Sequence, residues 1–94
     1  MFTGIVEEKG TIRYIQLTGE SGVLAVKAKK VLEGTKIGDS IAVNGICLTV
    51  TSLQSDGFTA DVMAETIRRS SLGSSRAGSK VNLERAMAAD GRLG

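Results

Sequence analysis

Twelve glycines recur at short intervals along this chain and separate short segments that are rich in branched apolar residues. Such segments, bounded by turn residues, are typical of antiparallel sheets, so the spacing predicts an all-β barrel or sandwich. Helical turns are expected at 29–34, closed by Gly34, and at 64–72, closed by Gly73. The expected strands are residues 2–6, 11–17, 22–28, 39–44, 46–53, 57–63 and 80–85.

A chain of 94 residues makes one domain, and its core must be aliphatic because Phe2, Tyr14 and Phe58 are its only aromatic residues. The 12 basic and 10 acidic residues nearly balance, and the net charge of +2 is too small to indicate a nucleic-acid partner or a membrane partner. The start of the sequence has no basic segment and no long apolar stretch, so neither a signal peptide nor a membrane span is expected. The single cysteine, Cys47, cannot form an internal disulfide, and the cytoplasm is the expected compartment.

The chain contains no histidine, which removes the commonest metal ligand and the commonest general base. One cysteine without histidine also leaves no zinc site of ordinary composition. No metal is therefore expected, and any catalysis must run without imidazole unless another chain supplies it.

Asn44-Gly45 predicts a two-residue hairpin turn of the primed kind, because a type I′ turn needs positive φ at both central positions. The strand that follows alternates strictly: one face is apolar, and the other carries Cys47, Thr49 and Thr51 without any charge. Small neutral polar groups suit the edges of a planar heterocycle, and they suit an edge strand that meets a partner chain equally well. A lone cysteine is more often a small buried hydrophobe than a nucleophile, although here the opposite, apolar face of the strand is the one expected to pack in the core.

A second hairpin turn is expected at Ser55-Asp56-Gly57, which makes 39–63 a three-stranded meander. Its register places the segment 61–66 beside the start of the Cys47 strand. Backbone groups that leave the ladder there are able to bond a ligand, and Thr66 can add a hydroxyl. The alternative is an ordinary helix N-terminus with an acidic first turn.

Four motifs then occur in order along the chain: MFTGIVEEKG, GDSIAVNGICLTVT, DVMAETIRRSSLG, and VNLERAM followed by DGRLG. In these motifs the sequence resembles the riboflavin synthase family, specifically the N-terminal half of its members, over essentially the whole chain. The lumazine-binding fluorescent proteins share the fold and some of the motifs.

The resemblance implies a six-stranded antiparallel Greek-key barrel with one or two short helices, one of two similar barrels in the family's enzyme. The family's reaction is a dismutation in which one 6,7-dimethyl-8-ribityllumazine donates a four-carbon unit to another. The products are riboflavin and 5-amino-6-ribitylaminouracil, and no metal or redox cofactor takes part. The full family chain is a homotrimer, whose active site forms between the N-terminal barrel of one subunit and the C-terminal barrel of a neighbour.

Carried over position by position, the resemblance implies that Cys47, Ser40 and Phe2 are candidate catalytic residues near the reacting ring. It also implies that three short stretches bind the substrate or product, a lumazine or riboflavin. These are Gly4, Ile5 and Val6, then Cys47, Leu48 and Thr49, and finally Asp61, Val62, Met63, Ala64, Glu65 and Thr66.

The family continues after DGRLG into a Gly-His motif and a second barrel, which residues 1–94 do not include. One barrel holds one lumazine, so we expect little or no turnover from this domain by itself, and a homodimer that binds one ligand per chain. The alternative function is a non-catalytic carrier of a lumazine or flavin. A nucleic-acid-binding barrel is disfavoured, because residues 46–51 carry neither an aromatic nor a charged group.

Overall fold

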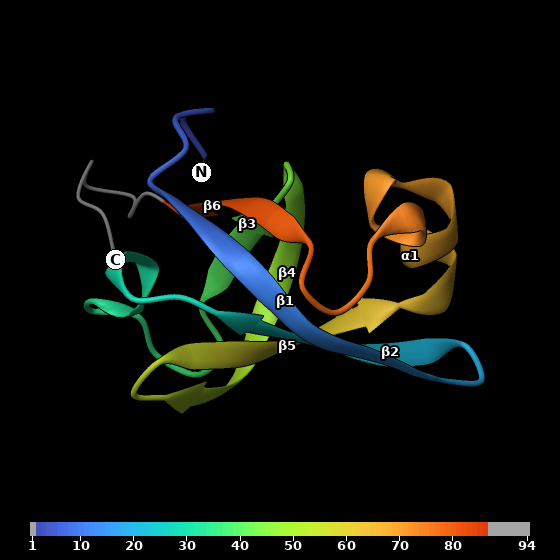
Figure 1. The fold of residues 1–94 in the computed structure, drawn as a ribbon. Coiled ribbons are helices and arrows are strands. Elements are labelled where there is room, and N and C mark those ends of the chain that lie inside the picture. Colours follow the sequence, from blue (N-terminus) through green and yellow to red (C-terminus); the bar gives the residue numbers. More distant parts are fainter. Residues whose placement is uncertain (1, 87–94) are drawn as a thin grey trace.

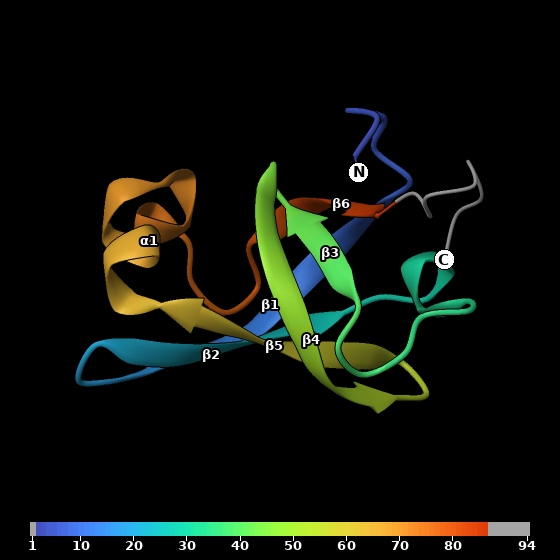
Figure 2. The same cartoon turned by 180° about the vertical axis from the view of Figure 1, so that it is seen from behind.

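Six antiparallel strands close into a barrel in the computed structural model, which describes residues 2–86 (Figures 1 and 2). The strands are β1 (Glu8–Thr18), β2 (Ser21–Lys27), β3 (Ser40–Val43), β4 (Ile46–Gln54), β5 (Gly57–Met63) and β6 (Lys80–Arg85), and the helices are η1 (Lys30–Leu32), α1 (Ala64–Arg69) and η2 (Ser71–Ser74). The order around the barrel is β1-β2-β5-β4-β3-β6. This confirms the expected six-stranded antiparallel barrel with short helices. No helix in the described part of the chain is long and apolar enough to cross a membrane.

The inward faces of the strands make the core, as the alternation of apolar residues predicts. Phe58 is the largest fully buried side chain, and aliphatic residues supply the rest. Val31 of η1, Ile67 of α1 and Leu72 of η2 join the same cluster, so burial of apolar side chains holds the helical turns to the barrel. Each such side chain stabilises the fold by roughly 1.5–3 kcal/mol.

The expected strand at 2–6 is wrong, because β1 begins at Glu8 and the residues before it join no ladder. Gly4 has a φ of +83°, which breaks an extended run. The backbone N–H groups of Thr3 and Gly4 donate to the side-chain carboxylate of Glu84 and not to the backbone of a neighbouring strand. The other six strands match the expected ranges to within three residues.

The expected helix at 64–72 is interrupted, because α1 ends at Arg69 and η2 follows as a separate turn. The interruption lies at Ser70, whose backbone is extended and whose hydroxyl accepts a hydrogen bond from the Leu72 N–H at 3.2 Å. Serine favours this capping role over a helix interior. Gly73 lies within η2 and is not the helix cap that the sequence predicts, whereas Gly34 follows η1 with a φ of +72°.

Both expected hairpin turns are present, and they depend on glycine in different ways. Asn44 and Gly45 have φ values of 50° and 83°, the left-handed conformation that a primed turn requires. In the second hairpin the two turn residues are 55 and 56, and Gly57 already belongs to β5. Gly57 is needed for a close approach, because a Cβ there would overlap the Val26 carbonyl oxygen of β2.

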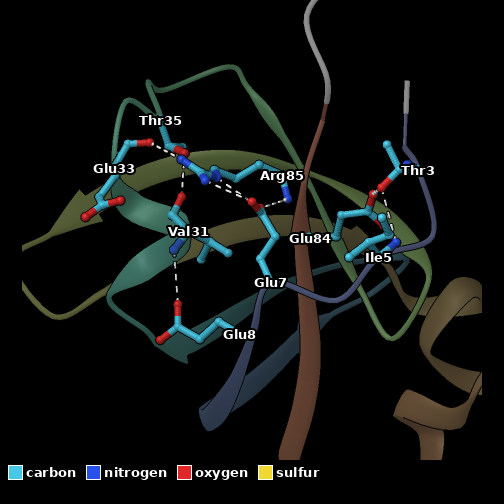
Figure 3. Close-up of polar contacts among 9 residues, drawn as sticks. All are labelled: Thr3, Ile5, Glu7, Glu8, Val31, Glu33, Thr35, Glu84 and Arg85. Atoms are coloured by element: carbon cyan, nitrogen blue, oxygen red, sulfur yellow. Dashed lines mark hydrogen bonds and ion pairs between the residues drawn. The ribbon is translucent and has the colours of Figure 1, made fainter. Parts of the chain in front are cut away.

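A polar cluster ties the start of β1 and the end of β6 to η1 (Figure 3). Arg85 donates to the Glu7 carboxylate at 2.8 and 2.9 Å and to the Glu33 carbonyl oxygen at 2.7 Å. The Glu8 carboxylate accepts from the Val31 N–H at 3.0 Å. Only 9% of the Glu7 side chain and 13% of the Arg85 side chain are exposed. The hydrogen bonds from Arg85 lower the pKa of Glu7, and the same contact raises the pKa of Arg85.

Because folding lowers the pKa of Glu7, its contribution to stability is complete above the ordinary glutamate pKa of about 4.3 and is lost as the pH falls through the lower folded value. At neutral pH we expect Glu7→Gln to reduce the free energy of unfolding by about 1–3 kcal/mol. Urea unfolding across the acid range should show this difference shrinking. The control is Glu65→Gln, which removes the exposed ion pair with Arg69 and should cost less than about 0.5 kcal/mol. A deficit of Glu7→Gln that persists undiminished in acid would contradict this account.

Candidate functional site

Three of the predicted site residues form one row on the outside of the barrel. Ser40 of β3 pairs with Thr49 of β4, and Thr49 pairs on its other side with Asp61 of β5. Thr49 and Asp61 are exposed and Ser40 is half-buried. Ala42 and Cys47 also pair with each other, and they lie on the same outer face because alternate residues of a strand share a face.

β4 and β5 separate just beyond this row. Within residues 2–86 their ladder ends at the pair Thr49–Asp61, although β5 stays paired with β2 as far as Met63. Figure 2 shows β4 turning away while β5 runs on into α1. The start of β4 and the end of β5 are therefore unpaired with each other.

The backbones of Cys47 and Met63 face this unpaired region. In a two-residue hairpin the residues that flank the turn form a hydrogen-bonded pair, and the direction of the N–H and C=O groups alternates from there. The backbone groups of Cys47 therefore point away from β3 and toward β5. The Ala64 N–H bonds the Glu20 carbonyl oxygen on the opposite side of β5, so the backbone groups of Met63 point toward β4.

The hydroxyl groups near this face divide into two kinds. Thr51 shares a hydrogen bond with Thr59 of β5 at 2.9 Å. The side chains of Ser40, Thr49 and Thr66 make no hydrogen bond to any other described residue, and none of them is a buried polar group without a partner. On the uncharged face of β4, the Thr51 hydroxyl is therefore engaged in a hydrogen bond within the protein, whereas the Thr49 hydroxyl is able to bond a ligand.

Two hollows flank Met63, whose side chain is 61% exposed. One, of about 360 Å³, lies against α1 and is lined by Met63, Glu65, Thr66, Arg69 and Ser70. The other, of about 490 Å³, lies beside the β1–β2 hairpin and is lined by Gln16, Thr18, Ser21, Gly22, Val23, Asp61, Val62 and Met63. Both volumes fall within the usual range of small-molecule sites.

The N-terminal residues of the predicted site lie on the β3 side of Cys47, opposite to the side on which Met63 lies. Gly4 and Val6 line a hollow of about 220 Å³ together with Ala42, the cross-strand partner of Cys47. Ile5 is 69% exposed and Val6 is 49% exposed. Apolar side chains therefore reach solvent on this flank of the face.

Not every predicted site residue can contact a ligand with its side chain. Leu48, Val62 and Ala64 are buried, so only their backbone groups can reach a ligand. Phe2 is half-buried at the start of the described residues. Among residues 2–86, no three His, Cys, Asp or Glu side chains gather into a metal-binding group.

The hollows also contain residues that the sequence analysis misses. Gln16 and Ser21 line the larger one, and Arg69 and Ser70 line the one against α1. The missing signal for the first two is strand order, because β2 lies beside β5 although β3 and β4 separate them in the sequence, and Gln16 of β1 pairs with Val23 of β2. Arg69 could be found from its spacing, since a residue four positions after Glu65 shares its helix face.

A family model described as "Lumazine binding domain" matches residues 3–86. The chain is 60% identical over 94 residues to the riboflavin synthase of Actinobacillus pleuropneumoniae and 57% identical to that of Bacillus subtilis. It covers 44% of each of those proteins, so it spans less than half of the length of these curated relatives.

Solved structures agree with the sequence comparison. LumP complexed with 6,7-dimethyl-8-(1'-D-ribityl) lumazine is similar with a TM-score of 0.78 at 29% identity, over 99% of this chain and 54% of that chain. LumP complexed with riboflavin has a TM-score of 0.81 at 24% identity, over 89% of this chain and 46% of that chain, which shows a common fold. The resemblance that the four motifs carry is confirmed.

The opposite faces of β4 can be tested by substitution at two consecutive residues. Cys47 is exposed, so we expect Cys47→Ser to change the free energy of unfolding by no more than about 0.5 kcal/mol. Leu48 is 4% exposed in the core, and Leu48→Ala should cost about 2–5 kcal/mol. Chemical denaturation measures both, and a comparable loss in the two variants would show that Cys47 packs inside.

Proposed function

Since the chain belongs to the family of lumazine-binding domains, we propose that it binds 6,7-dimethyl-8-ribityllumazine or riboflavin on the outer face of β3, β4 and β5, as one barrel of a riboflavin synthase. In the parent enzyme, one lumazine donates a four-carbon unit to a second one, and riboflavin and 5-amino-6-ribitylaminouracil are released. The observation that carries the proposal is the unpaired backbone between Cys47 and Met63.

The pyrimidine edge of a lumazine or a flavin presents a C=O, an N–H and a second C=O in one plane. It therefore needs a donor, an acceptor and a second donor at fixed places. The backbone N–H and C=O groups of Cys47 supply a donor and an acceptor, and the hydroxyl of Thr49 or Thr66 supplies the other donor. The ring takes the place of the ladder that β4 and β5 do not form, much as an added peptide strand would.

The surroundings of this edge suit the rest of the ligand. The exposed Met63 side chain, together with Ile5 and Val6, offers apolar contacts to the ring. The hollows beside Met63 carry hydroxyl and carboxylate groups that can bond a ribityl chain. The lumazine in the LumP complex supports this class of ligand.

Cys47, Ser40 and Phe2 are assigned to the neighbourhood of the reacting ring. We assign the Cys47 thiol a contribution of shape beside the ring and not the role of a covalent nucleophile, since the described residues place no base on it. Cys47→Ser in the parent enzyme should therefore lower the rate only partly.

Turnover needs two lumazines face to face, because proximity and orientation supply much of the rate. The outer face of one barrel is open, and Ile5, Val6 and Met63 expose apolar surface next to it. We assign the isolated barrel a homodimer in which a second copy covers this face, and the parent chain a homotrimer. The cytoplasm remains the expected compartment.

A non-catalytic carrier of a lumazine or flavin is the second candidate function, and the lumazine-bound LumP structure favours it. The two functions differ in the chemistry of the parent chain. Riboflavin formation from lumazine by the parent chain supports the synthase, and ligand binding without turnover supports the carrier.

Thr49→Val tests the binding site, because it keeps the shape of the side chain and removes the hydroxyl. We expect it to weaken riboflavin binding by about 1–3 kcal/mol, the usual effect of leaving one polar group of the ring unpaired. The matched control is Thr51→Val on the same strand face, whose hydroxyl is bonded to Thr59, and its affinity should stay within about twofold. Fluorescence titration measures both, and an unchanged affinity for Thr49→Val would remove Thr49 from the site.

The isolated domain should form a homodimer that binds one riboflavin per chain and converts lumazine very slowly. Light scattering and a binding stoichiometry test the first two statements, and a riboflavin assay tests the third. A monomer at high concentration would contradict the proposed pairing. Rapid riboflavin formation by this domain would contradict the need for a second type of barrel.

A further inference from the structure

Glu84 is a buried carboxylate, 7% exposed, whose hydrogen-bond partners among the described residues all lie in the N-terminal segment, residues 2–7 (Figure 3). Its Oε2 accepts from the Thr3 N–H at 2.6 Å, from the Thr3 hydroxyl at 2.8 Å and from the Gly4 N–H at 3.1 Å. Its Oε1 lies 3.2 Å from the same Gly4 nitrogen. Successive N–H groups that converge on one anion form a backbone nest, and the positive φ of Gly4 turns its N–H toward the carboxylate.

The hydrogen bonds that start at this carboxylate reach Ile5 through Thr3. The Thr3 hydroxyl donates to Glu84 and accepts from the Ile5 N–H at 3.2 Å. One carboxylate thus determines the course of three successive residues. The next backbone anchor is the Glu7 N–H, which bonds the Leu83 carbonyl oxygen of β6 at 2.8 Å.

The strand register places Glu84 on the face that carries the proposed site. Glu84 pairs with Ala42, and Ala42 pairs with Cys47. Glu84 is therefore two strands, or roughly 10 Å, from Cys47, too far to bond a ring held at Cys47 itself. Ile5, which Glu84 holds through Thr3, and Val6, which lies between that contact and the Glu7 anchor, are exposed apolar side chains on that flank.

We propose that Glu84 is a positioning residue of the ligand site: it fixes the N-terminal segment so that Ile5 and Val6 form an apolar wall beside the ring. The inference rests on the proposed function. A buried carboxylate costs free energy unless hydrogen bonds compensate it, and within residues 2–86 the hydrogen bonds to the Glu84 carboxylate come from the segment that it positions.

The test measures riboflavin affinity and the NMR signals of the Ile5 methyl groups in the same variants. Glu84→Ala should move the Ile5 signals and weaken binding about tenfold. Glu84→Gln keeps one acceptor oxygen and should restore part of both effects. Thr3→Val removes the hydroxyl that links Glu84 to Ile5, leaves the Thr3 and Gly4 N–H bonds to the carboxylate, and should weaken binding roughly threefold. The control is Glu20→Gln, an exposed carboxylate in the β1–β2 turn, which should change neither readout.

Two results would overturn the proposal: moved Ile5 signals with unchanged affinity, or Ile5 signals that stay in place when the Glu84 carboxylate is removed. If Glu84→Ala does not fold, Glu84→Gln and Thr3→Val decide the question, because both retain hydrogen-bonding or steric replacements. Absence of riboflavin binding by the unmodified protein would contradict both the proposed function and the positioning role. Binding that is insensitive to every Glu84 and Thr3 variant would leave the function standing and remove only the positioning role.

Discussion

β5 stays paired with β2 to its end and leaves β4 beyond Asp61, and this division determines where the proposed site lies. The β2–β5 ladder is held closely, since Gly57 brings the two backbones together at the start of β5. Strands twist relative to their neighbours, so two partners cannot follow one strand indefinitely. The backbone groups freed at Cys47 and Met63 must then bond water or a ligand. The proposed binding face is thus a consequence of how the sheet of this barrel closes.

β6 supports both the barrel and that face through two consecutive residues. Arg85 pairs with Ile41 of the core side and bonds Glu7 and the Glu33 carbonyl oxygen, which holds η1 in place. Glu84 lies on the other side of the strand and holds Thr3 and Gly4. Alternation along one strand therefore separates a stabilising ion pair from a carboxylate that shapes the surface.

Local patterns in the sequence were sufficient for most of the fold and for the orientation of the β4 side chains at the centre of the proposed site. The primed turn at Asn44-Gly45 and the alternation after it place Cys47 and Thr49 outside and Leu48 inside. Local patterns failed where distant contacts override them. Residues 2–6 read as a strand by composition, but Glu84 draws them into an irregular segment, and the break at Ser70 depends on a single hydroxyl. Gln16 and Ser21 line the larger hollow because the β1–β2 hairpin lies beside β5, which no short-range pattern reports.

The separation of these contacts along the chain has a consequence for synthesis. Thr3 lies 81 residues before Glu84, and Glu7 lies 78 residues before Arg85. A nascent chain that leaves the ribosome therefore carries its first residues without their partners until β6 has emerged. Such distant contacts also form slowly, because a long loop must close before they stabilise anything. The proposed wall of Ile5 and Val6 is consequently the last part of the face to be assembled, and a truncated translation product lacks it.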